Sequence, residues 1–173
     1  GTVIWSAGNY WNGIIDENDM AVIRQYRGNM LFEGSDLGFD SNGDSSFEGM
    51  AGIEFDRDIT LDENNSALEL KNHKLLEGIG SIDLNSELSP FPDSVSTTNA
   101  EAIAGWKDAG AAITAYESGG AKKAYLGFSV NAIIETITRE RLISNLLSWL
   151  TYSNKPPVIN SVKTNSPVKE GER

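Results

Sequence analysis

The stretch from Arg27 to Asp40 constrains the fold of this chain most strongly, because it joins a strand pattern to a sharp turn. Asn29 to Phe32 is a short apolar run that predicts a buried β-strand. It leads into Gly34-Ser35-Asp36-Leu37-Gly38, a G-x-D-x-G sequence of the type that turns a strand sharply into a helix. In parallel α/β sheets such a turn lies at the carboxyl edge, where ligands bind. Asp36, at its centre, is therefore the first candidate site residue.

The residues before this turn predict a strand and a helix. Thr2 to Ser6 is a β-branched and aromatic run, typical of a buried strand. The acidic residues Asp16 to Asp19 are suited to begin a helix, because carboxylates bind its free N–H groups. Met20 and Ile23 follow at helical spacing. The order strand, helix, strand, turn indicates a βαβ unit, and hence an α/β fold with a parallel sheet.

The second half predicts an antiparallel hairpin near the carboxyl end, followed by a helix. Two apolar runs, Ala111 to Tyr116 and Lys122 to Phe128, flank the turn sequence Glu117 to Gly120. A helix is expected from Thr138, with an apolar stripe on one face that reaches Leu150.

The middle of the chain is less regular. Strands are expected at Gly52 to Phe55 and at Ala67 to Leu70. We interpret Pro90 to Ser94 as a turn-rich connection and predict a short helix, capped by Thr98 or Asn99, that runs through Trp106. Residues 1–153 then form one α/β domain, and residues 154–173 form a Pro-Pro linker and the start of an immunoglobulin-like or PKD-like β-sandwich.

Charge and composition exclude several classes of partner and chemistry. The formal net charge is −11, which argues against nucleic acid or an anionic membrane surface as the partner. No apolar run is long enough to insert into a membrane. The chain has no cysteine, so disulfides, thiolate metal sites and cysteine nucleophiles are all excluded.

One acidic segment resembles the beginning of a calcium-binding loop. Asp40, Asn42 and Asp44 have the D-x-N-x-D spacing that supplies hard oxygen ligands. The segment departs from the EF-hand pattern at the sixth position, where Ser45 replaces glycine, and at the twelfth, where Ala51 replaces glutamate. Calcium binding and a plain polar turn are both open interpretations, and no other cofactor is expected.

The order of these motifs resembles the class I glutamine amidotransferase-like, flavodoxin-like superfamily. It is most similar to divergent domains of large secreted or surface proteins of bacteria and archaea. The resemblance rests on V-I-W-S-A-G-N-Y-W, R-G-N-M-L-F-E-G-S-D-L-G, N-H-K-L-L-E-G-I, A-Y-L-G-F-S-V-N-A-I and R-E-R-L-I-S-N-L-L-S-W-L, which span most of Thr2 to Leu150. It implies a three-layer α/β/α sandwich with a mostly parallel, flavodoxin-like sheet.

The same resemblance implies that the first βα unit is missing. In this fold a strand and helix precede the strand that begins here at Thr2, and that first strand lies centrally in the sheet. Three explanations are open: the unit was removed, another chain supplies it, or the sheet closes differently.

The resemblance also implies that the catalytic residues have been lost. The nucleophilic cysteine of catalytic amidotransferases falls on Asp36, the histidine on Ser129 and the glutamate on Asn131. None of these side chains can perform the replaced residue's role, so we expect no glutaminase activity. The leading hypothesis is a non-catalytic binding or scaffolding module of a larger extracellular or cell-envelope protein of a prokaryote. Its expected partners are other domains of that protein, or a second chain or dimer mate that completes the sheet.

Two alternatives come from other functional classes. In the first, a hydrolase uses Asp36 as nucleophile and His73 to activate water, with Ser35 as a further catalytic candidate. In the second, the chain is a calcium- or ligand-binding accessory domain of a secreted peptidase or glycan-active protein. The residues expected along the ligand-binding edge of the sheet are Asn9, Tyr10, Trp11, Ser129 and Asn131.

Overall fold

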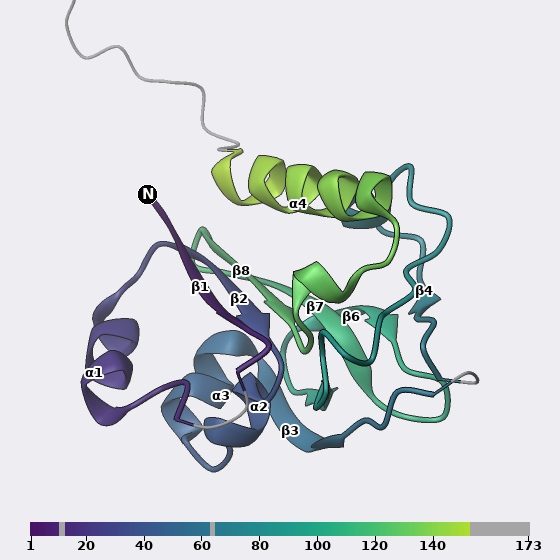
Figure 1. The fold of residues 1–173 in the computed structure, drawn as a ribbon. Helices are drawn as coiled ribbons and strands as arrows, with labels where there is room; N and C mark the ends of the chain where they lie inside the picture. Colours follow the sequence, from purple (N-terminus) through teal and green to yellow (C-terminus); the bar gives the residue numbers. More distant parts are fainter. Residues whose placement is uncertain (11–12, 63–64, 153–173) are drawn as a thin grey trace, which may run out of the picture.

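A computed structural model describes residues 1–10, 13–62 and 65–152. The chain forms a mixed α/β structure in which helices cover both faces of a central sheet, as predicted (Figure 1). The predicted linker and β-sandwich segment, residues 154–173, lies outside the described residues, and so does Trp11. Among the described residues, no helix is both long and apolar enough to cross a membrane.

In the described part of the chain, the sheet contains eight strands, and four α-helices and two short 3₁₀ turns accompany it. The strands are β1 (Thr2–Gly8), β2 (Asn29–Gly34), β3 (Ile53–Asp58), β4 (Glu69–Leu70), β5 (Asp93–Thr97), β6 (Glu101–Gly105), β7 (Ala111–Ser118) and β8 (Ala121–Leu126). The helices are α1 (Glu17–Gln25), α2 (Leu37–Asp40), α3 (Ser45–Ala51) and α4 (Thr136–Thr151), with 3₁₀ turns η1 (Lys74–Leu76) and η2 (Val130–Ala132).

The strand order is β1-β2-β8-β7-β5-β3, with β6 paired to β7 and β4 paired to β6. The pairs β1–β2 and β2–β8 are parallel, and the other pairs are antiparallel. The parallel part is therefore smaller than the sequence indicated, while the β7–β8 hairpin agrees with the prediction.

Because β1 pairs directly with β2, and β2 with β8, the sheet closes without a further strand between them.

The two faces of the sheet carry separate hydrophobic cores. Helices α1, α2 and α3 lie on one face and α4 on the other (Figure 1). Strand β2 contributes to both cores, because alternate side chains of a strand point to opposite faces. Met30 and Phe32 pack with α1 and α3, whereas Leu31 packs in the core beneath α4. This burial on both faces explains why the β2 sequence is a continuous apolar run.

Two local predictions in the middle of the chain are wrong. The segment predicted to be a short helix through Trp106 is β6, whose Glu-Ala-Ile-Ala-Gly sequence is compatible with a helix but pairs with β7 instead. The presumed connection Pro90 to Ser94 contains the start of β5, which places Asp93 in the sheet. In both cases long-range strand pairing overrides the local preference, and a single sequence does not show that pairing.

Candidate functional site

The G-x-D-x-G sequence forms a sharp turn between β2 and α2. Gly34 has φ 150°, and Asp36 is left-handed with φ 59° and ψ 6°. The Asp36 N–H donates to the Phe91 carbonyl at 3.0 Å, which fixes the turn against the segment that leads into β5. Asp36 is only 5% exposed as a residue, and its side chain makes no helix-capping hydrogen bond. The turn therefore directs this carboxyl into the protein.

Close packing requires both glycines of this turn. A Cβ atom at Gly34 would lie 2.6 Å from the Cβ of Ala7 on β1. A Cβ atom at Gly38 would lie 2.7 Å from the Tyr125 hydroxyl and 3.1 Å from Asp93 Oδ2. The glycines of the motif thus allow α2 to pack closely against β5 and β8, in addition to forming the turn.

Three carboxyl groups meet at this turn. Asp36, Asp58 and Asp93 each place an oxygen so that the three oxygens lie within 4.8 Å of one another. Asp58 ends β3 and Asp93 begins β5, and the two are directly opposite in the antiparallel register. Asp36 and Asp93 are buried, whereas Asp58 is exposed. We call these three residues the acidic cluster.

Asp93 is the most enclosed member of the acidic cluster. Its Oδ2 accepts hydrogen bonds from the Tyr125 hydroxyl at 2.5 Å and from the Gly38 N–H at 2.7 Å. Its Oδ1 is buried and has no hydrogen-bond partner among the described residues. Burial raises the pKa of Asp93 to about 7, and the charges of Asp36 and Asp58 add to this, against the opposing hydrogen bonds.

The other two carboxyls of the acidic cluster also bind protons more readily than usual. Burial raises the pKa of Asp36 to about 6, with smaller contributions from Asp58 and Asp40. Burial also raises the pKa of Asp58. Among the described residues, no lysine or arginine forms an ion pair with any of the three. The acidic cluster is therefore a set of closely spaced carboxyl groups without a cationic partner among the described residues.

The structure brings Ser35 and Ser129 together but does not assemble a triad from them. Both residues are buried, and each contacts Ser89, which no sequence motif marks. The Ser35 and Ser89 hydroxyls are 2.6 Å apart, and the Ser129 N–H donates to Ser89 Oγ at 3.2 Å. Asn131 is exposed, and its carbonyl accepts from Arg139. These residues anchor the start of η2 to the β2–α2 turn.

His73 and Asp36 lie on opposite faces of the sheet. His73 precedes η1, which packs against α4 on the face away from α2. Its Nδ1 accepts from the Leu75 N–H at 3.2 Å, and its Nε2 lies 3.9 Å from a Glu101 oxygen. Burial lowers the pKa of His73. The hydrolase hypothesis requires His73 to activate a water molecule beside Asp36, and these two residues do not form that arrangement.

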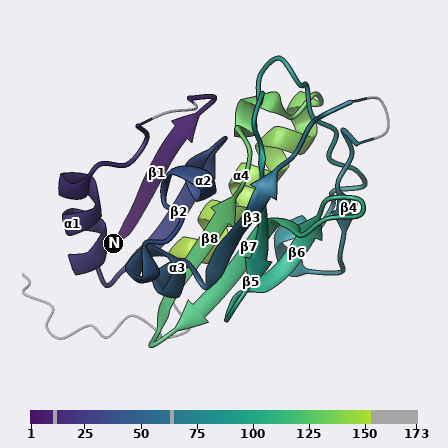
Figure 2. The same ribbon diagram turned by 90° about the horizontal axis from the view of Figure 1, so that it is seen from below.

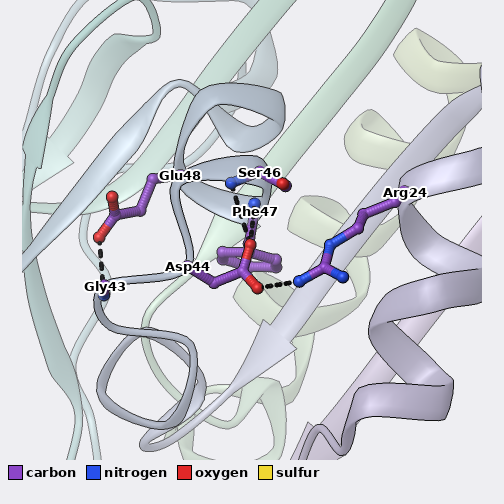
Figure 3. A network of polar contacts seen from close by, with 6 residues as sticks. All are labelled: Arg24, Gly43, Asp44, Ser46, Phe47 and Glu48. Atoms are coloured by element: carbon purple, nitrogen blue, oxygen red, sulfur yellow. Dashed lines mark hydrogen bonds and ion pairs between the residues drawn. The ribbon is translucent and has the colours of Figure 1, made fainter.

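Protein donors already engage Asp44 of the calcium-like loop. Its Oδ1 accepts from the N–H groups of Ser46 and Phe47, at 2.9 and 3.0 Å, and so caps α3. Its Oδ2 pairs with the Arg24 guanidinium of α1 (Figure 3). These contacts hold the pKa of Asp44 below its usual value, against an opposing effect of burial. Asp44 thus joins α1 to α3.

Asp40 and Asn42 lie beside this contact. Asp40 Oδ2 accepts from the N–H groups of Ile14 and Ile15, at 2.6 and 3.0 Å. Asp40 and Asn42 also line a surface cavity of about 350 Å³ together with Asp44. The cavity is polar, but the carboxylates of Asp40 and Asp44 that border it already bind protein donors.

The expected ligand-binding edge residues Asn9 and Tyr10 follow β1 and are exposed. They lie apart in sequence from the acidic cluster, of which the sequence motifs mark Asp36. Asp58 lies beyond the predicted strand Gly52 to Phe55, and Asp93 lies in the predicted connection, so local patterns do not predict their pairing across β3 and β5. The local signal is that one aspartate ends the segment Ile53–Asp58 and another begins the segment Asp93–Thr97.

No known protein family and no curated protein matches this sequence. Solved structures do share its fold. Gan42B, a GH42 β-galactosidase from G. stearothermophilus, has 14% identity and a TM-score of 0.60 over 88% of this chain. The β-galactosidase from Bacillus circulans sp. alkalophilus has 15% identity and a TM-score of 0.58 over 88% of this chain. The chain spans only 22% and 23% of the lengths of these two enzymes.

Two further structures with the same fold come from different proteins. The N-terminal domain of mmIFT52 has 14% identity and a TM-score of 0.58, covering 89% of this chain and 79% of that domain. Agd3, described as a novel carbohydrate deacetylase, has 11% identity and a TM-score of 0.54, covering 87% of this chain and 25% of Agd3. At these identities the likeness establishes the fold alone.

Proposed function

We propose that this chain is a non-catalytic interaction module of a larger carbohydrate-active protein, secreted or displayed on a prokaryotic cell surface. In this proposal it is a divergent member of the class I glutamine amidotransferase-like superfamily and docks against a neighbouring domain of the same protein. The fold likeness to parts of β-galactosidases and of a carbohydrate deacetylase supports the setting. The acidic, cysteine-free composition is compatible with an extracellular location.

The proposal that the chain is non-catalytic is supported by the three positions on which the amidotransferase catalytic residues fall. Asp36 is buried at the turn, Ser129 is buried against Ser89, and Asn131 is exposed with its carbonyl bound to Arg139. A covalent hydrolase needs a nucleophile, a base within hydrogen-bond reach and an accessible substrate position. Asp36, Ser129 and Asn131 do not together provide a nucleophile, a base and an accessible substrate position.

The observation that carries the docking role is the open edge of β1. Among the described residues this strand ends the sheet, and Figure 2 shows it at the side of the molecule next to α1. Its sequence, Thr-Val-Ile-Trp-Ser-Ala-Gly, contains no charge and no proline, the features that usually protect an edge strand from pairing. Val3 and Trp5 pack into the core on the α1 side, whereas Ile4 is 52% exposed. An apolar, unprotected edge of this kind is suited to contact another domain.

The test compares two exposed isoleucines. Ile4→Lys places a charge on the β1 edge, and Ile137→Lys places the same charge on α4, where the isoleucine is 75% exposed. We expect Ile4→Lys to weaken binding of this chain to the remainder of its parent protein at least about tenfold, and Ile137→Lys to leave binding unchanged. Calorimetric titration measures the affinity, and circular dichroism verifies that both variants are folded.

Equal affinity of the Ile4→Lys variant and the unmodified chain would refute docking through β1. Self-association of the chain that Ile4→Lys abolishes would show that a second copy, rather than a neighbouring domain, occupies the edge.

A further inference from the structure

We propose that Asp36, Asp58 and Asp93 bind a divalent cation that prefers oxygen ligands. The site lies where the β2–α2 turn meets the β3–β5 pair, and it is distinct from the calcium-like loop at residues 40–44. It is also independent of the proposed docking role, because β1 contributes no residue to it.

The geometry fits one cation. Carboxylate oxygens bind calcium at about 2.3–2.6 Å, so ligands of a single ion lie no more than about 5 Å apart. The three carboxyl oxygens of the acidic cluster lie within 4.8 Å of one another. Asp36 and Asp93 supply the buried side of the site, and the exposed Asp58 leaves a path from solvent. Water completes the coordination of such ions in many proteins.

An unmet acceptor in the buried part of the acidic cluster points independently to a ligand. Asp93 is fully buried, and its Oδ2 is occupied by the Tyr125 hydroxyl and the Gly38 N–H. Its Oδ1, equally buried, has no partner among the described residues. A buried carboxylate oxygen without a donor is costly, and a cation at the acidic cluster would satisfy it.

The backbone holds the three carboxyls in place before any ligand arrives. Two consecutive residues before β5 bind the backbone beside the other two aspartates: the Phe91 carbonyl accepts from the Asp36 N–H in the β2–α2 turn, and the Pro92 carbonyl accepts from the Ile59 N–H, next to Asp58. The Asp93 N–H donates to the Gly127 carbonyl at 2.6 Å, and its own carbonyl accepts from Trp106 Nε1 at 2.9 Å. Like charges held this closely repel one another unless a cation or a proton intervenes.

The test is thermal unfolding with calcium, magnesium or manganese chloride in millimolar excess, compared with a chelator, at about pH 8. We expect at least one of these salts to raise the unfolding midpoint by about 5 °C or more, and titration calorimetry to give one ion per chain. Asp93→Asn and Asp36→Asn should each remove the shift. Asp58→Asn provides the same test at an exposed position, where the fold is least at risk.

Asp44→Asn is the matched control, because it alters the calcium-like loop and leaves the acidic cluster intact. A shift that survives in Asp44→Asn supports the proposal, whereas a shift lost only in Asp44→Asn would move the site to that loop and overturn it. The proposal also fails if no salt shifts the midpoint, since the acidic cluster would then be held by protons alone.

Discussion

Substitution of Gly34 by alanine is expected to destabilise the chain by about 3 kcal/mol or more. At φ 150° an L-residue is strained, and the added Cβ would lie 2.6 Å from the Cβ of Ala7 and 3.2 Å from the Gly8 nitrogen. Both neighbours belong to β1, so relief requires β1 to separate from β2. Denaturant unfolding measures the loss as a lower midpoint with an unchanged slope.

Gly49→Ala is the matched control for this prediction. Gly49 lies in α3, and a Cβ there meets no atom within 4 Å. Alanine has the higher helix propensity, so stability should stay the same or increase by up to about 1 kcal/mol. A Gly34→Ala variant that unfolds at the same midpoint as the unmodified chain would contradict the account of the turn.

The second large expected effect is that Asp93 makes the folded chain less stable as pH rises, the opposite of the effect of an aspartate whose pKa is lowered by folding. In the unfolded chain its carboxyl has a pKa of 3.8, whereas in the folded chain the value is about 7. Between these values the folded state binds more protons than the unfolded state, so stability falls as pH rises. The stabilisation is complete below the unfolded pKa and is lost as pH rises through the folded pKa. Asp36, with a folded pKa of about 6, acts in the same direction.

Asp93→Asn should therefore stabilise the cation-free chain above neutral pH. The rise of the Asp93 pKa from 3.8 to about 7 corresponds to an energy on the order of 4 kcal/mol, so the variant should gain a few kcal/mol at about pH 8 and little at about pH 4. The asparagine oxygen can still accept from Tyr125 and Gly38, and its NH₂ group can donate to the neighbouring carboxyls. Denaturant unfolding in a chelator, at a series of pH values, measures the difference.

The exposed carboxyl of Glu87 serves as the control, since it lies outside the acidic cluster. Glu87→Gln should leave the pH profile unchanged to within about 0.5 kcal/mol. If Asp93→Asn lowers stability equally at every pH, the carboxyl acts only through its hydrogen bonds, and burial does not raise its pKa as described.

Much of the fold follows from local sequence patterns. The Thr2 strand, the helix begun at Asp16, the β7–β8 hairpin and the carboxyl-terminal helix each carry a distinct periodicity or turn signal. Asp16 indeed caps α1, because its Oδ1 accepts from the N–H groups of Asn18 and Asp19. Such signals lie within a few residues of one another, so a single sequence contains them completely.

The acidic cluster follows only in part from the sequence. Asp36 is marked by the glycines around it, but Asp58 and Asp93 become neighbours through the register of two strands that are separated by 34 residues of the chain. The segment 90–94 looks like a turn because of its prolines, although Asp93 enters the sheet immediately after Pro92. Long-range pairing of this kind depends on the whole fold, and local propensity does not encode it.

Amide hydrogen exchange of β1 tests the central claim most directly, because it reports whether this edge meets another domain. The account predicts that β1 amides not bonded to β2 exchange rapidly in the isolated chain and become protected in the intact parent protein. The amides of α4 around Ile137 should exchange equally in both. Equal exchange of β1 in the two forms would contradict the claim that this chain is a module that docks through its open edge.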